Sequence, residues 1–234
     1  MNPILAIETA TEALSLAVRD GDRIWERHEI AARKQAEWIL PWTDGLLLDA
    51  GVNRRDLQAI AVSIGPGAFT GVRLGLSVAQ GMALALNVPL IGVSTLAALA
   101  MGAVRISGAQ RILAVIDARM GEVYAARFAW RDGVLMPVGA AQVVAPSNLD
   151  LSGIDAGWHV VGTGIDAVEG TLRQRLPADC ANDATALPHA TDVMTLADVE
   201  IAAGRLSLPE QVEPAYLRNR VALTIAEREQ GEKL

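Results

Sequence analysis

The sequence has almost no cysteine: Cys180 is the only one among 234 residues. One thiol forms neither an intramolecular disulfide nor a cysteine-based metal site, so a disulfide-stapled scaffold is excluded. This usage fits the reducing cytoplasm. Disorder is excluded as well, because hydrophobic residues make up 51% of the chain.

The chain also has few basic residues. The chain has 20 Lys and Arg residues against 27 Asp and Glu residues, for a net charge of −7. An acidic protein gains little from counterion release by nucleic acids. We therefore expect contact with RNA only indirectly, through a partner. The N-terminal residues lack a basic region and include Glu8 and Glu12, which argues against a signal peptide.

Charge is missing altogether between Arg73 and Arg105. Length alone would allow this run to cross a membrane. Asn87, Pro89 and Gly92 interrupt it, however, and such residues end helices and form turns. We therefore expect a helix, a strand and a second helix that are buried in the protein, and no membrane association.

The remaining pattern predicts an α/β protein. Asp20-Gly21 is a turn signal between two strands, and Gly51 is well placed to end a helix. Expected strands cover residues 4–9, 13–19, 23–30, 57–64, 89–94, 112–117, 122–130 and 158–164. Expected helices cover residues 37–49, 69–86, 95–104, 165–176 and 191–204, and a short helix is expected in the tail at residues 213–229.

The second half of the chain repeats the first. ILAVID at residues 112–117 resembles ILAIET at residues 4–9, and an Arg-Asp-Gly turn follows the second strand of each half. We interpret this as a duplication of β-β-β-α-β-α subdomains, the order of elements found in actin-like ATPases. The expected subdomains are residues 1–106 and a degenerate one at 107–234, whose last helix is expected to pack back on the first.

Actin-like enzymes hold phosphates between two glycine-containing hairpin turns, because glycine lets backbone N–H groups approach phosphate oxygens. The corresponding turn at residues 8–11 has no glycine, and the turn at residues 117–121 has only one. Glu8 and Asp117 are either degenerate metal ligands or residues that tie down their turns, and we favour the second interpretation. No metal or nucleotide cofactor is expected.

The stretch GPGAFTGVRLG, residues 65–75, is not a phosphate-binding motif of a known type. It lacks the lysine of a Walker loop and the spacing of a dinucleotide fingerprint. The chain has no G-x-S-x-G elbow. His28, His159 and His189 are far apart in the sequence and lack metal-binding spacing, so we interpret them as ordinary residues.

Small residues recur every four positions in the helix that follows this loop, at Gly71, Gly75, Ala79 and Ala83. Such a stripe allows close approach of another element. It either packs on the chain's own sheet or receives a partner helix, and we favour the partner. The residues expected at this interface are Trp38, Ile39, Trp42, Leu46, Gly71, Leu74, Gly75, Val78, Ala79 and Met82.

These residues resemble those of a known family, the bacterial TsaB proteins, also called YeaZ. The resemblance runs through ILAIETATEALSLAV, KQAEWILP, SIGPGAFTGVRLGLSVAQG, ILAVIDARMGEVYAARF and PAYLR. It implies an actin-like, ribonuclease-H-like fold that has lost catalytic power. It further implies action with the catalytic subunit TsaD and the ATPase TsaE, in threonylcarbamoyl transfer to an adenosine beside the anticodon of certain tRNAs.

The resemblance also implies an interface. The helices at residues 34–49 and 69–86 would bind TsaD and, when the chain is alone, a second copy of it. Glu8 stands where the family often has Asp, and Gln35-Ala36 where it often has His-Ser, so a residual metal role is further weakened. The glycoprotease name once given to the wider group finds no support, because no zinc ligand set or nucleophile constellation is present.

The motif loop has its own expected role. Gly65, Pro66 and Gly67 are expected to form a tight connection from strand to helix, followed by Phe69 and Thr70. Arg73 is expected to pair with an acid of the partner or with a nucleotide near the interface, or to be solvated. The alternatives to a partner subunit are an active actin-like small-molecule kinase or ATPase, a stand-alone structural homodimer and, last, a protease.

Overall fold

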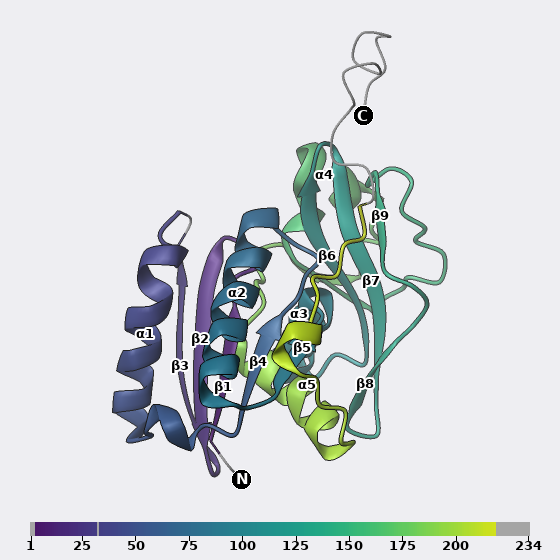
Figure 1. Ribbon diagram of the computed structural model, residues 1–234. Coiled ribbons are helices and arrows are strands. Elements are labelled where there is room, and N and C mark those ends of the chain that lie inside the picture. Colours follow the sequence, from purple (N-terminus) through teal and green to yellow (C-terminus); the bar gives the residue numbers. More distant parts are fainter. Residues whose placement is uncertain (1–2, 32, 219–234) are drawn as a thin grey trace, which may run out of the picture.

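The computed structural model describes residues 3–31 and 33–218. The helix expected in the tail falls partly on residues 219–229 and so lies outside the described residues. Two sheets and the helices that cover them make up the described chain (Figure 1).

The first sheet contains the five strands predicted for the N-terminal half. Its order is β3-β2-β1-β4-β5, with β1, β4 and β5 parallel and the β1-β2-β3 meander antiparallel. The strands are β1 (Ile4–Glu8), β2 (Ala13–Asp20), β3 (Arg23–Ile30), β4 (Ala59–Ser63) and β5 (Leu90–Val93). Every residue of β1 and β4 is buried, as their continuous apolar runs predict.

The second sheet repeats this arrangement. Its order is β11-β10-β6-β7-β8, so β6 corresponds to β1 and β10 to β4, and β9 pairs with β7 beside β8. The strands are β6 (Arg111–Arg119), β7 (Glu122–Arg131), β8 (Val134–Pro137), β9 (Gln142–Val144), β10 (His159–Val161) and β11 (Ala181–Asp183). The repeated order confirms the predicted duplicated, actin-like fold.

Five α-helices accompany these strands within the described residues. They are α1 (Gln35–Ala50), α2 (Phe69–Leu86), α3 (Thr95–Ser107), α4 (Ala167–Arg175) and α5 (Ala190–Ala202), with short 3-10 turns at Arg54–Asp56, Thr163–Ile165 and Pro209–Gln211. Gly51 ends α1 with a left-handed φ of 68°, as predicted. The helix predicted at residues 165–176 is wrong in detail, because residues 168–170 have left-handed backbone angles.

Two of the helices, α3 and α5, each pack on the sheet of the other half. Helices α1 and α2 cover one face of the first sheet (Figure 1), and α5, from the C-terminal half, packs on its other face. Helix α3, from the N-terminal half, packs on the second sheet and against α5. The predicted boundary at residues 106 and 107 falls at the end of α3, and it stays a prediction.

The charge-free run also has a clear place in the fold. It forms α2, β5 and α3, the three elements that its punctuation predicts. Helix α2 is long and apolar enough to cross a membrane by length and composition, but its inner face packs on the first sheet.

Candidate functional site

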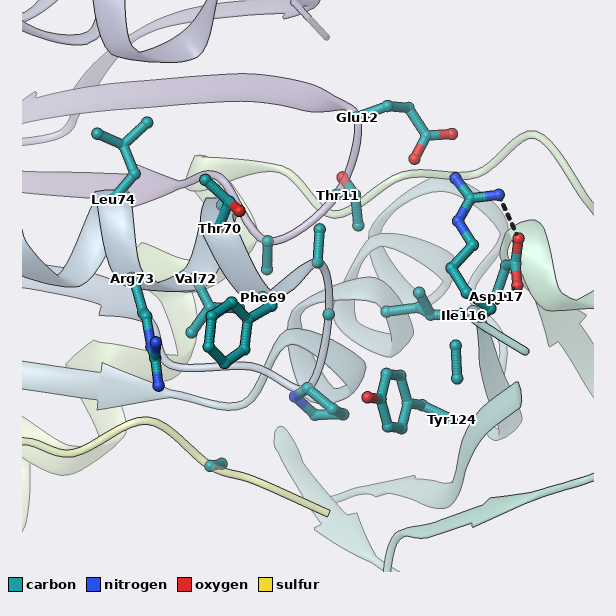
Figure 2. A pocket seen from close by; sticks show the side chains of 18 of the residues that line it. Thr11, Glu12, Phe69, Thr70, Val72, Arg73, Leu74, Ile116, Asp117 and Tyr124 are labelled. Carbon is teal, nitrogen blue, oxygen red and sulfur yellow. Dashed lines mark hydrogen bonds and ion pairs between the residues drawn. The ribbon is translucent and has the colours of Figure 1, made fainter. Parts of the chain in front are cut away.

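A cleft of about 990 Å³ opens between the two halves (Figure 2). Residues 10–12 and the start of α2 line it from the first half, and Asp117, Arg119 and Tyr124 line it from the second. Residues 215–218 complete the wall. In an actin-like fold this is where a nucleotide would lie, so the chemistry of its two turns decides what the cleft can do.

The loop before α2 presses against the first turn. The Ala68 N–H donates to the Ala10 carbonyl at 2.7 Å, and the Thr9 hydroxyl donates to the Gly71 carbonyl at 2.8 Å. A Cβ atom added to Gly67 would lie 2.2 Å from the Ala10 carbonyl oxygen. The loop therefore approaches the backbone of the first turn closely, and it meets carbonyl oxygens there, which repel phosphate rather than bind it.

Glu8 lies under this turn and does not line the cleft. Its side chain is fully buried and accepts hydrogen bonds from the Ala10 N–H, at 2.5 Å, and from the Ser63 hydroxyl. Burial raises the pKa of Glu8 to about 7, against the opposing effect of these hydrogen bonds and of His189. These contacts favour the interpretation of Glu8 as a residue that ties down its turn.

Replacing Glu8 with glutamine should therefore stabilise the protein at alkaline pH. The raised pKa means that Glu8 favours folding below its ordinary value of 4.5, and that this contribution is lost as pH rises through about 7. We expect Glu8→Gln to gain about 3 kcal/mol over the wild type between about pH 4.5 and pH 8. Urea unfolding at both values measures this gain, and equal pH profiles for the two proteins would contradict it.

Asp117 lines the cleft but is held by its own turn. Its Oδ1 accepts from the Arg119 N–H at 2.8 Å, and its Oδ2 pairs with the Arg119 guanidinium at 2.7 Å (dashed line in Figure 2). Its own N–H donates to Thr163 Oγ1 at 3.2 Å. Within residues 3–31 and 33–218, no cluster of His, Cys, Asp or Glu residues is arranged to hold a metal ion.

Arg73 has a partner that sequence reasoning did not find. Its guanidinium carbon lies 3.6 Å from the centre of the Phe69 ring, and its Nε donates to Tyr216 Oη at 2.8 Å. The segment after α5 carries Tyr216 past α2 towards the second sheet (Figure 1). Arg73 and Tyr216 are 143 positions apart, so no local pattern in the sequence links them.

The orientation predicted for the small-residue stripe is wrong. Gly71, Gly75, Ala79 and Ala83 are buried against the chain's own sheet. A Cβ atom on Gly71 would lie 2.1 Å from the Thr9 carbonyl oxygen, and one on Gly75 would lie 2.2 Å from Thr9 Oγ1. The stripe thus brings α2 close to β1 and the first turn, because glycine alone leaves room for that backbone.

Ile39 and Leu46 of α1 also point inwards and are only 1% and 2% exposed. They are core residues, so the structure does not offer them directly to a partner, contrary to expectation. Gly71, Gly75 and Ala79 of α2 are buried in the same way and are not directly available to a partner either.

The other predicted interface residues are partly exposed, on the two helices that cover one face of the first sheet. Trp38 and Trp42 of α1, and Leu74, Val78 and Met82 of α2, are half-buried. The two indole rings stack with centroids 5.3 Å apart. Four of the five side chains also pack against the core under the two helices. We call these five residues the outer helix face.

The three histidines are not the scattered residues that the sequence suggested. His28, His159 and His189 all line a second cavity of about 490 Å³, formed where β3, α3, β10 and the residues before α5 meet. Sequence spacing could not reveal this, because each histidine lies on a different element.

The chain is similar in sequence and in structure to known proteins. The chain is 40% identical over 225 residues to the tRNA threonylcarbamoyladenosine biosynthesis protein TsaB of Escherichia coli, covering 94% of this chain and 96% of that protein. It is 33% identical over 231 residues to TsaB of Haemophilus influenzae, covering 93% of this chain and 94% of that protein.

The solved structure of YeaZ from Pseudomonas aeruginosa matches with a TM-score of 0.86 and 41% identity, over 93% of this chain and all of that one. The family model for TsaD, described as tRNA N6-adenosine threonylcarbamoyltransferase, matches residues 27–224. The chain belongs to the TsaB family, also known as YeaZ.

Proposed function

We propose that this chain is a non-catalytic subunit of a cytoplasmic complex. It binds a TsaD-type catalytic subunit and activates it for threonylcarbamoyl transfer to tRNA. The observation that carries this proposal is the outer helix face, where two stacked tryptophans and three aliphatic side chains lie half-exposed on neighbouring helices. Tryptophan is one of the residues that most often contribute a large share of the binding energy at protein interfaces.

The cleft supports the absence of catalysis. The first turn meets the α2 loop through its carbonyl groups, Glu8 is buried, and both oxygens of Asp117 are bound by Arg119. A phosphoryl-transfer site needs free N–H groups and carboxylates that can reach a metal ion. Among the described residues, Glu12 lines the cleft from the first half, but Asp117 across from it is bound by Arg119, so the two turns offer no free carboxylate pair.

Activation then follows from binding alone. A subunit that binds one conformation of TsaD better than another shifts TsaD towards that conformation by the difference in binding free energy. The ATPase TsaE joins through the complex, tRNA is contacted only through the partner, and a second copy of the chain occupies the outer helix face when TsaD is absent.

A reconstituted transfer reaction tests the proposal. TsaD, TsaE, ATP, a threonylcarbamoyl-adenylate donor and tRNA are combined with and without this chain, and modified adenosine is measured by mass spectrometry. We expect product only when the chain is present, with saturation near equal concentrations of chain and TsaD. Undiminished product in its absence would contradict the proposed role.

ATP turnover separates this proposal from an actin-like kinase. We expect the purified chain with Mg²⁺ to hydrolyse no ATP above the buffer background, and Asp117→Asn to behave identically, because Asp117 is already bound by Arg119. Phosphate release by the wild type that Asp117→Asn abolishes would favour the kinase instead.

A further inference from the structure

The N-terminus of α5 is fastened to the first sheet by side chains of β2 and β3. The Ala190 N–H donates to Ser15 Oγ at 2.9 Å, and the Thr191 N–H donates to Glu26 Oε1 at 3.1 Å. The Ser15 hydroxyl in turn donates to the same Glu26 oxygen at 3.0 Å. Glu26 therefore caps a helix that lies about 165 positions away in sequence.

Two histidines complete this attachment. His189, the residue before α5, places its Nδ1 3.3 Å from Glu26 Oε2. The His28 ring of β3 stacks on the His189 ring, with centroids 3.8 Å apart and planes 8° apart. His28 Nδ1 is buried and has no hydrogen-bond partner among the described residues.

We propose that Glu26, His28 and His189 form an acid-sensitive latch that holds the N-terminus of α5 on β3 and opens when His28 becomes protonated. The Glu26 carboxylate contacts the His189 ring and not the His28 ring. A positive charge on His28, whose ring is stacked 3.8 Å from that of His189 and whose buried Nδ1 has no hydrogen-bond partner among the described residues, is therefore not directly paired. Opening would loosen α5, which packs on the first sheet and on α3 where the two halves join.

The direction of the pH effect follows from the two groups. Burial, and then the charge of His189, lower the pKa of His28, while Glu26 raises it. The contribution of neutral His28 is therefore complete above about 6.5 and is lost as pH falls below that value. Burial opposes the charge of Glu26, but hydrogen bonds from His189 and Thr191 outweigh it and lower its pKa to about 2. Glu26 thus stays charged while His28 titrates.

Other charged groups surround the latch. Asp192 of α5 is buried and paired with Arg105 of α3, Arg19 of β2 pairs with Asp198 of α5, and His159 of β10 bonds Ser107. Further groups around the cluster are Glu29 of β3, Asp183 of β11 and Glu8 of β1. Glu8 gains its proton in the same pH range and favours folding as it does so, so global stability is a poor readout.

Amide hydrogen exchange of the intact chain measures directly how often the N-terminus of α5 opens. We expect the protection factor of the Thr191 amide, relative to amides in the middle of α3, to fall about tenfold between about pH 7.5 and pH 5.5. His28→Phe keeps a stacked ring that cannot be charged, so its Thr191 protection should stay constant. His159→Phe is the matched control in the same cavity and should lose protection as the wild type does.

Two outcomes would overturn the latch. One is equal Thr191 protection in the wild type at both pH values. The other is a loss in His28→Phe as large as in the wild type. If His28→Phe does not fold, as judged by circular dichroism, His28→Gln provides the same comparison with a neutral side chain.

Discussion

Val78→Arg should weaken binding to a TsaD-type partner by more than about 100-fold while the chain stays folded. Val78 lies on the outer helix face between Leu74 and Met82, and an arginine there would place a charge in the centre of an apolar interface. Hot-spot residues near the centre of an interface cost at least about 2 kcal/mol when they are truncated, and a charge buried there adds to the loss. Isothermal titration calorimetry of each variant against TsaD measures the change.

Val199→Arg is the matched control for this variant. Val199 lies on α5, which covers the opposite face of the first sheet, and it is 38% exposed. The same substitution there should leave the affinity for TsaD within about twofold of the wild type. Equal affinities for Val78→Arg and the wild type would mean that the outer helix face does not bind TsaD.

Gly71→Ala should lower the free energy of unfolding by about 3 kcal/mol, because the added methyl group meets a backbone carbonyl that cannot easily move. The ideal Cβ would lie 2.1 Å from the Thr9 carbonyl oxygen. If the small-residue stripe instead faced a partner, the same variant would fold normally and lose only binding. Urea unfolding followed by circular dichroism distinguishes these outcomes.

Gly81 provides the control on the same helix. It is exposed, and a Cβ atom added there would have no neighbour within 4 Å. Gly81→Ala should therefore raise the free energy of unfolding by about 1 kcal/mol, the difference in helix propensity between glycine and alanine. A destabilisation similar to that of Gly71→Ala would show that the cost is not steric.

Much of the fold follows from local patterns. The strands of the first sheet are continuous apolar runs or are joined by an Asp-Gly turn, and Gly51 ends α1 as predicted. Strands β8, β9 and β11 were missed, because runs of three or four residues carry no readable periodicity. The left-handed residues at 168–170 include a valine and a glutamate, and both residue types disfavour this conformation. The sequence therefore contains no local signal that predicts the left-handed backbone there.

The candidate site was harder to predict. Small residues at every fourth position identify one face of α2. The same spacing suits packing on a sheet and packing on a partner helix. The sequence therefore could not show which of the two Gly71 and Gly75 face. The contact of Arg73 with Tyr216 and the cavity that collects three histidines depend on chain crossings that no local pattern reveals.

Oxidative footprinting tests the central proposal most directly, because the outer helix face contains its own probes. Trp38, Trp42 and Met82 are partly accessible, while Met136 of β8 is 50% exposed and serves as the internal reference. On addition of TsaD, the account predicts that oxidation of the two tryptophans and Met82 falls at least about fivefold while oxidation of Met136 is unchanged. Protection of Met136 with no change at Trp38 and Trp42 would contradict it.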